Sequence, residues 1–175
     1  MLRTSRLPLP SAPMAHQTRN RVLWNQSRSR ERADFFTMGY TGRPLSELLD
    51  TLVLNGVSTL ADIRQNPVSM YRPELSRANL KRSVEERGLH YVHFPDLGVP
   101  RDIRAKAIGT GNREVIWAWY DEYVARPYVG RNLHFFFNSV DHPVAFMCVE
   151  VDPCECHRHR LFVALEARGL KGFDL

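Results

Sequence analysis

The stretch FFTMGYTGRPLSELLDTLVLNGVSTLADI, residues 35–63, decides the fold. It opens with Phe35–Gly39, an apolar run that predicts a short buried strand. Pro44 then suits a first helical turn, and leucines recur at helical spacing until Asn55-Gly56 ends the helix. A second β-rich run, Val57–Ile63, follows. The stretch therefore predicts strand, helix and strand in succession, the repeating unit of a parallel sheet.

The same alternation continues to the end of the chain. The later elements that the pattern predicts are a helix through Leu75, Leu80 and Val84, a strand Leu89–Phe94, a helix through Val115, Trp119 and Tyr123, a helix Asn132–Ser139, a strand Val144–Val149, a helix through Leu161 and Leu165, and a fifth strand beginning in the last five residues. We expect Pro95 to Asn112 to be a long irregular loop. Residues 34–175 should thus form a single three-layer α/β domain, with a mostly parallel sheet of four or five strands and helices on both faces.

Length and composition fit one soluble domain. Of the 175 residues, 43% are hydrophobic and 25% are charged, and a chain of this size buries a real core. No apolar run approaches the roughly 18 residues that a membrane helix needs, so we expect no membrane partner. The three cysteines lie within nine positions of one another, unlike the spread of a secreted disulfide framework, which predicts a reducing cytoplasm.

The formal net charge of +5 is concentrated in the N-terminal arm. Residues 1–30 contain no Asp or Glu, and their arginines are Arg3, Arg6, Arg19, Arg21, Arg28 and Arg30. Such a composition is typical of an organelle transit peptide, of a basic nucleic-acid tail, or of sequence upstream of a later start. We expect residues 1–33 to be a disordered basic extension and the remainder to be nearly neutral.

The unusual polar chemistry of the chain follows the predicted strands. Ligands of parallel sheets bind beyond the carboxyl ends of the strands. The densest loop there, CVEVDPCECHR at residues 148–158, runs from a strand into a helix. Alternation along the strand places Cys148 and Glu150 on one face. Free N–H groups in the first turn of the helix would suit an anion and lower the pKa of the Cys156 thiol.

In these loops the chain resembles the domain-of-unknown-function family 488. The motifs that carry the resemblance, in order between about Phe36 and Gly169, are Gly39-Tyr40-Thr-Gly42-Arg43, Asp62-Ile-Arg64 with Pro67 and Ser69, Leu97-Gly98, Cys148-Val-Glu150 and Cys156-His157-Arg158. The resemblance implies an α/β fold and one polar site built from these motifs. It implies no particular reaction, because the family is named for lacking one.

The favoured interpretation is a site for a small anionic ligand, phosphate-bearing or nucleotide-like, with catalysis left open. The residues expected to bind the ligand are Tyr40, Arg43, Asp62, Arg64, Ser69 and Arg158. The residues expected to act in catalysis are Glu150, Cys156 and His157. No cofactor is expected. The competing structural interpretation makes Cys148 a small core residue and makes Asp62 and Arg64 a loop-ordering ion pair.

Two further interpretations use the cysteines. Cys154 and Arg160 have the bare spacing of a phosphatase or rhodanese loop, but Glu155 and His157 would crowd the amides that face an oxyanion. Residue types that suit zinc or iron are also present, at Cys148, Cys154, Cys156, His157 and His159. We expect no metal, because Cys-x-Cys-His packs its ligands too closely for all of them to be used.

A non-enzymatic nucleic-acid-binding module is the last alternative. Besides the basic arm, the residues available to contact phosphates and bases are Arg72, Arg77, Lys81, Arg82 and Tyr71. The solvated face of an ordinary helix explains the same charges. We expect Trp117 and Trp119 to be packing residues rather than platforms for stacked bases.

Overall fold

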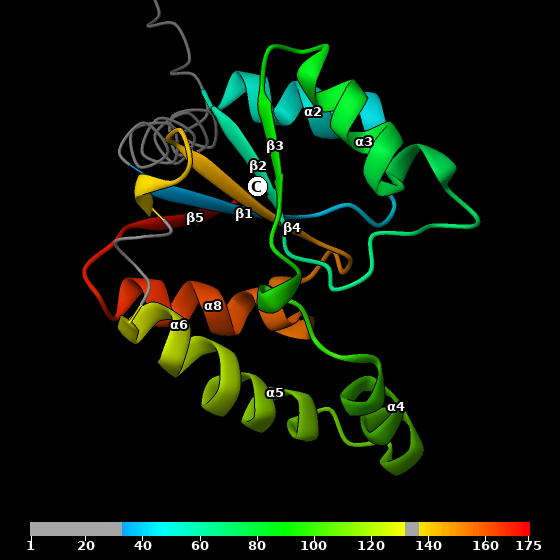
Figure 1. The fold of residues 1–175 in the computed structure, drawn as a ribbon, viewed down its shortest axis with the longest axis vertical. Coiled ribbons are helices and arrows are strands. Elements are labelled where there is room, and N and C mark those ends of the chain that lie inside the picture. The colour runs from blue at the N-terminus through cyan, green and yellow to red at the C-terminus, as the bar shows by residue number, and fades with distance from the viewer. Residues whose placement is uncertain (1–32, 132–136) are drawn as a thin grey trace, which may run out of the picture.

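The structure, a computed structural model, describes residues 33–131 and 137–175. Five parallel strands form one sheet in the order β3-β2-β4-β1-β5 (Figure 1). They are β1 (Phe35–Gly39), β2 (Thr59–Asp62), β3 (His90–His93), β4 (Val144–Cys148) and β5 (Gly172–Asp174). The predicted parallel sheet is confirmed, and the fifth strand pairs with β1 at one edge.

Helices cover both faces of the sheet, as predicted for a three-layer fold. They are α2 (Leu45–Leu54), α3 (Arg77–Glu85), α4 (Arg101–Thr110), α5 (Glu114–Tyr120), α6 (Arg126–Arg131) and α8 (His157–Glu166). Figure 1 shows α2 and α3 on one side of the sheet, and α5, α6 and α8 on the other. In the parts of the chain described above, no helix combines the length and the hydrophobicity needed to cross a bilayer.

The central strand β4 supplies both hydrophobic cores. Successive residues of a strand point to opposite faces. Val144, Phe146 and Cys148 accordingly pack in the core against α8. Ala145 and Met147 pack in the core against α2 and α3. This alternation points the Cys148 side chain toward α8, the helix that carries the other half of the predicted site.

The parallel register brings the predicted site loops to one edge of the sheet. Gly39 lies opposite Cys148, and Asp62 lies opposite both Met147 and His93. The strands β1, β2, β3 and β4 therefore end at nearly the same level. The loops that follow them share one neighbourhood, which is the arrangement expected for a ligand site in a parallel sheet.

The prediction of one long irregular loop after β3 is wrong. The region from Pro95 to Asn112 contains a short 3-10 turn, Pro95–Leu97, and the ten-residue helix α4. Of the α4 residues only Ala107 is buried, so the helix carries little of the apolar periodicity by which helices are recognised. The helix expected at Asn132–Ser139 falls mostly on residues outside the described ranges, as does the N-terminal extension up to residue 32.

A buried arginine fixes the connection between β4 and α8. The side chain of Arg158 is 0% exposed. Its guanidinium donates hydrogen bonds to the backbone oxygens of Glu150 and, at 2.8 Å, of Val151, and its Nε lies 3.2 Å from the carboxylate of Asp174 in β5. Gly39 makes room for this loop, because a Cβ there would overlap the carbonyl oxygen of Glu150. Arg158 thus joins the loop, α8 and the edge strand.

We expect the substitution Arg158→Met to lower the free energy of unfolding by about 3 kcal/mol, since it removes the donor to the backbone oxygens of Glu150 and Val151 and the charged partner of the partly buried Asp174 carboxylate. Urea denaturation followed by circular dichroism measures the change. Arg168→Met is the matched control, because Arg168 is exposed just beyond the end of α8; it should cost less than about 0.5 kcal/mol. Equal losses in the two variants would contradict the anchoring role.

Candidate functional site

A pocket of about 490 Å³ opens at the carboxyl ends of the strands. Its walls include residues from each of the four loops that follow β1 to β4, represented by Tyr40, Arg64, Val99 and Glu150. The helices α4 and α5 form the outer wall, and the first residue of α8, His157, completes it. The predicted convergence of the strand-end loops on one site is therefore present as a cavity.

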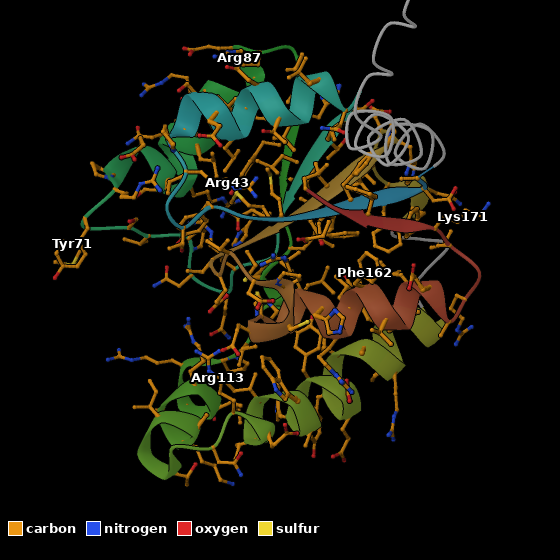
Figure 2. All side chains as sticks on the ribbon, turned by 180° about the vertical axis from the view of Figure 1, so that it is seen from behind. Arg43, Tyr71, Arg87, Arg113, Phe162 and Lys171 are labelled. Carbon is orange, nitrogen blue, oxygen red and sulfur yellow. The ribbon has the colours of Figure 1, made fainter. Side chains whose placement is uncertain are left out.

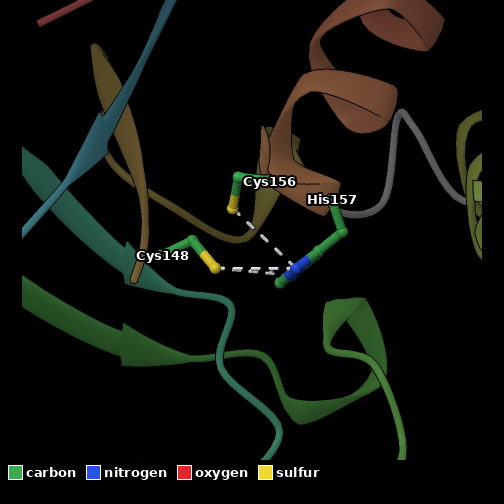
Figure 3. A group of neighbouring side chains, drawn as sticks. All are labelled: Cys148, Cys156 and His157. Carbon is green, nitrogen blue, oxygen red and sulfur yellow. Dashed lines mark hydrogen bonds between the residues drawn. The ribbon is translucent and has the colours of Figure 1, made fainter. Parts of the chain in front are cut away.

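Two thiols and an imidazole meet beside this pocket. Figure 3 shows the side chains of Cys148, Cys156 and His157 pointing toward one another. The Nδ1 atom of His157 lies 3.5 Å from Sγ of Cys148 and 4.0 Å from Sγ of Cys156. Both thiols are 1% exposed. The carboxylate of Glu150 lies 3.8 Å from Sγ of Cys148. We call Cys148, Cys156 and His157 the thiol–imidazole cluster.

The local sequence explains how the cluster assembles. Cys148 is the last residue of β4, and the turn Pro153–Glu155 returns the chain so that Cys156 immediately precedes α8. The Asp152 carboxylate accepts a 2.8 Å hydrogen bond from the backbone N–H of Cys154 and stabilises this turn. Cys154 itself is exposed. The imidazole of His157 packs against the ring of the buried Tyr120, with the ring centroids 5.1 Å apart.

The two buried thiols differ in their electrostatics. Burial raises the pKa of Cys148, and the adjoining Cys156 raises it further. Burial also opposes ionisation of Cys156, but hydrogen bonds with Cys148 and His157 outweigh it and hold the pKa of Cys156 well below the ordinary thiol range. Burial and the neighbouring Cys156 raise the pKa of the Glu150 carboxyl. The pKa values of the two buried thiols are therefore shifted in opposite directions.

A second polar group, at the end of β2, is a buried ion pair. The guanidinium of Arg64 donates to both carboxylate oxygens of Asp62, at 2.8 and 2.6 Å, and to the backbone oxygen of Leu75 at 2.9 Å. The hydroxyl of Tyr91 donates to the same carboxylate at 2.8 Å. The Arg64 guanidinium also lies 5.2 Å from the centre of the Tyr40 ring. This pair orders the loop and presents Arg64 and Tyr40 at the pocket wall.

The predicted site residues divide into three groups. Those that line the pocket are Tyr40, Arg64, Glu150 and His157. Cys156 and Asp62 contact pocket-lining residues from behind, through His157 and Arg64 respectively. The third group, outside the pocket lining, consists of Arg43, Ser69 and Arg158.

Each residue of the third group has a structural contact. Arg43 donates to the backbone oxygen of Leu175 at 2.9 Å. Ser69 accepts a 3.1 Å hydrogen bond from the backbone N–H of Arg72. Arg158 makes the contacts with Glu150, Val151 and Asp174 that anchor the loop before α8. Figure 2 shows Arg43 on the side of the sheet that carries α2, away from Arg113 at the pocket.

Sequence reasoning missed the outer wall of the pocket. The pocket is lined there by Arg104 of α4, by Arg113, which immediately precedes α5, and by Trp117 of α5. Arg113 forms an ion pair with Glu155 across the pocket mouth. Because α4 was expected to be loop, no signal tied its arginine to the strand ends. Trp117, expected to be a packing residue, is half-buried and contributes to the wall.

The remaining interpretations find less support in the structure. The guanidinium of Arg160 binds the carboxylate of Asp121, with Nε at 2.8 Å, rather than facing Cys154. In the basic stretch, Arg72 donates to backbone oxygens at 3.2 and 2.8 Å, and Lys81 lies 3.7 Å from Glu85. These internal contacts occupy charges that a phosphatase-like loop or a nucleic-acid surface would need.

The burial of the cysteines predicts their reactivity. In the native protein, the disulfide reagent of Ellman should modify the exposed Cys154 rapidly and should modify Cys148 and Cys156 slowly, because reagent access limits the reaction. In denaturant all three thiols should react at similar rates. Cys154→Ser should remove the rapid phase alone. Three equally rapid thiols in the folded protein would contradict the arrangement in Figure 3.

Comparison with known proteins gives one match. No curated protein matches the chain. No solved structure matches it either. The family model described as "Domain of unknown function DUF488" matches residues 44–165, which is more than half of the chain. The matched range contains the whole thiol–imidazole cluster and the Asp62–Arg64 pair. The chain therefore belongs to the DUF488 family of domains of unknown function.

Proposed function

We propose that the strand-end pocket binds a small anionic ligand, phosphate-bearing or nucleotide-like. The observation that carries the proposal is the unpaired charge of Arg104 on the pocket wall. Within residues 33–131 and 137–175, its guanidinium has no hydrogen bond and no ion pair. An anion entering the pocket would supply the missing partner, and hydrogen bonds to charged groups are the stronger ones.

The other two guanidinium groups of the pocket are already matched by carboxylates. Arg64 pairs with Asp62, and Arg113 pairs with Glu155. These two ion pairs order the walls and contribute little net charge. Arg104 is therefore the main source of attraction for an anionic ligand. Arg104 lies on the exposed side of α4 and reaches the pocket from its rim. This placement favours a ligand whose anionic group stays near the pocket mouth.

The size and lining of the pocket support an organic ligand rather than a bare ion. Small-molecule sites commonly occupy about 300–1,000 Å³ and combine apolar walls with a few convergent polar groups. The volume of about 490 Å³ falls in that range. Tyr40 and Trp117 offer aromatic surface, and Val99 and Ile116 offer aliphatic surface. A ligand with a flat or apolar part and one anionic end fits this combination.

We further propose that chemistry, where it occurs, takes place at the inner end of the pocket. Glu150 and His157 line that region and lie next to Cys148 and Cys156. A ligand held by Arg104 would extend toward these groups. All three cysteines are free thiols, which supports the proposal that the protein works in a reducing cytoplasm.

The substitution Arg104→Ala should weaken binding of a nucleoside monophosphate and of pyrophosphate by roughly 10- to 100-fold, the effect of losing one charge-assisted hydrogen bond. Isothermal titration calorimetry on the full chain measures the affinity, after thermal-shift screening has ranked the two probes. Arg101→Ala is the matched control, because Arg101 is an exposed arginine of the same helix that does not line the pocket.

An equal loss of affinity in the two variants would contradict the pocket assignment. It would indicate that the probes are attracted by the general positive charge of the surface rather than by Arg104. Binding of single-stranded RNA that survives Arg104→Ala, with no binding of either small probe, would favour the nucleic-acid-binding alternative. Because the Arg104 guanidinium makes no hydrogen bond or ion pair within the described residues, its removal should change the melting temperature of the free protein little.

A further inference from the structure

We propose that the thiol–imidazole cluster binds one divalent cation of the zinc type, with its fourth coordination position facing the strand-end pocket. Its ligand atoms would be Sγ of Cys148, Sγ of Cys156 and a ring nitrogen of His157. These three atoms all lie within 4.8 Å of one another. The inference goes beyond the proposed anionic ligand and stands without it.

The distances between the ligand atoms fit a tetrahedral zinc site. With Zn–S bonds of about 2.3 Å and Zn–N bonds of about 2.0–2.1 Å, a sulfur and a nitrogen ligand lie about 3.6 Å apart. The two sulfur–nitrogen distances to Nδ1 of His157 are 3.5 Å and 4.0 Å. Sγ of Cys148 also lies 3.7 Å from Nε2 of His157, so the imidazole would rotate on metal binding to direct one ring nitrogen at an ion shared with both sulfurs.

The cluster is also built to hold its ligands still. Cys148 ends a strand at the centre of the sheet, and Cys156 and His157 begin a helix whose entry loop is anchored by Arg158. The ring of Tyr120 packs on the imidazole, and its hydroxyl donates to the backbone oxygen of Leu97 at 2.9 Å. Metal sites depend on such outer contacts, which fix the orientation of the ligands.

The chemistry of the ligand atoms selects the class of ion. Thiolate and imidazole favour zinc and similar transition metals, whereas magnesium and calcium prefer oxygen ligands. Two thiolates would balance the charge of one divalent ion, so the buried centre would be neutral overall. The thiols must lose their protons on binding, which makes the affinity fall at low pH.

The position of the pocket decides where the fourth ligand would come from. Cys148 and His157 line the pocket, while Cys156 lies behind them. The remaining tetrahedral position would therefore be directed into the pocket, next to Glu150. Three protein ligands with one open position are typical of catalytic zinc sites, whereas structural sites use four. Water or the anionic end of a ligand would occupy that position.

This inference revises our expectation of no metal. That expectation weighed Cys148, Cys154, Cys156, His157 and His159 together and rejected them because Cys-x-Cys-His is too tightly spaced for all of them to bind one ion. The structure reduces this set, because Cys154 is exposed and the ligand atoms of Cys148, Cys156 and His157 lie within 4.8 Å of one another. The ligands are thus the last residue of β4, the residue before α8 and the first residue of α8.

Cobalt titration tests the proposal on the full chain, after treatment with a chelator under reducing conditions. We expect one Co²⁺ per chain, with a thiolate-to-cobalt charge-transfer band and the intense visible bands of tetrahedral coordination. Added Zn²⁺ should abolish these bands by displacing the cobalt. A wild-type protein that binds no Co²⁺, or binds it without the thiolate band, would overturn the proposal.

Variants assign the ligands. Cys148→Ser, Cys156→Ser and His157→Gln should each weaken Co²⁺ binding by more than about 100-fold, because loss of an outer contact alone costs about 10- to 100-fold. Cys154→Ser and His159→Gln are the matched controls and should bind like the wild type. Equal weakening in the controls and the ligand variants would refute the assignment.

Circular dichroism establishes that each variant is folded. Should a ligand variant unfold, the wild-type spectrum and the two controls still decide the question. Arg104→Ala separates this proposal from the anionic ligand: it should keep the cobalt bands while losing phosphate binding. Loss of the cobalt bands in Arg104→Ala would count against a metal site formed by these three ligands.

Discussion

The buried guanidinium of Arg158 is the contact on which the geometry of the site depends. Its donors hold the backbone of Glu150 and Val151, while Asp174 ties the same group to the edge strand β5. Together with the hydrogen bond from the backbone N–H of Thr41 to Val149, these bonds hold the loop between β4 and α8 and so the separation of Cys148 and Cys156. A buried charge costs solvation energy, which only a full set of partners offsets. Arg158 therefore supports the site by anchoring its loop and does not line the pocket itself.

The Asp62–Arg64 ion pair orders the loop after β2 in a similar way, because a buried charge there is matched by internal partners. Asp62 is fully buried and accepts from Arg64 and Tyr91, so the loop after β2 is ordered by its own ion pair. Two of the three arginines that line the pocket, Arg64 and Arg113, are thus matched by carboxylates. In a wall of this kind a single unmatched cation, Arg104, has a large effect on which ligand is favoured, because the paired charges largely cancel at the distance of the ligand.

The central strands could be predicted from sequence because β1 and β4 are short apolar runs that alternate between two buried faces, as in Val144–Cys148. The loops after them could be located for the same reason. The helix α4 could not, since it buries only Ala107 and shows no apolar stripe. Residue type alone also could not separate Arg158 from Arg104: the guanidinium of Arg158 is buried among hydrogen-bond partners, whereas that of Arg104 lines the pocket without one in the described residues. That difference is set by tertiary contacts between β4, α8 and β5.

The thiol–imidazole cluster shows why a site of this kind is hard to predict from the spacing of residues along the chain. Two buried thiols at the end of an apolar strand and the start of a helix would ordinarily be neutral packing residues. Here Cys148 and His157 line the pocket, Cys156 lies behind them, and the pKa of Cys156 is held low against the effect of burial. An ion held by Cys148, Cys156 and His157 would place its open coordination position where Glu150 and a ligand at Arg104 both have access.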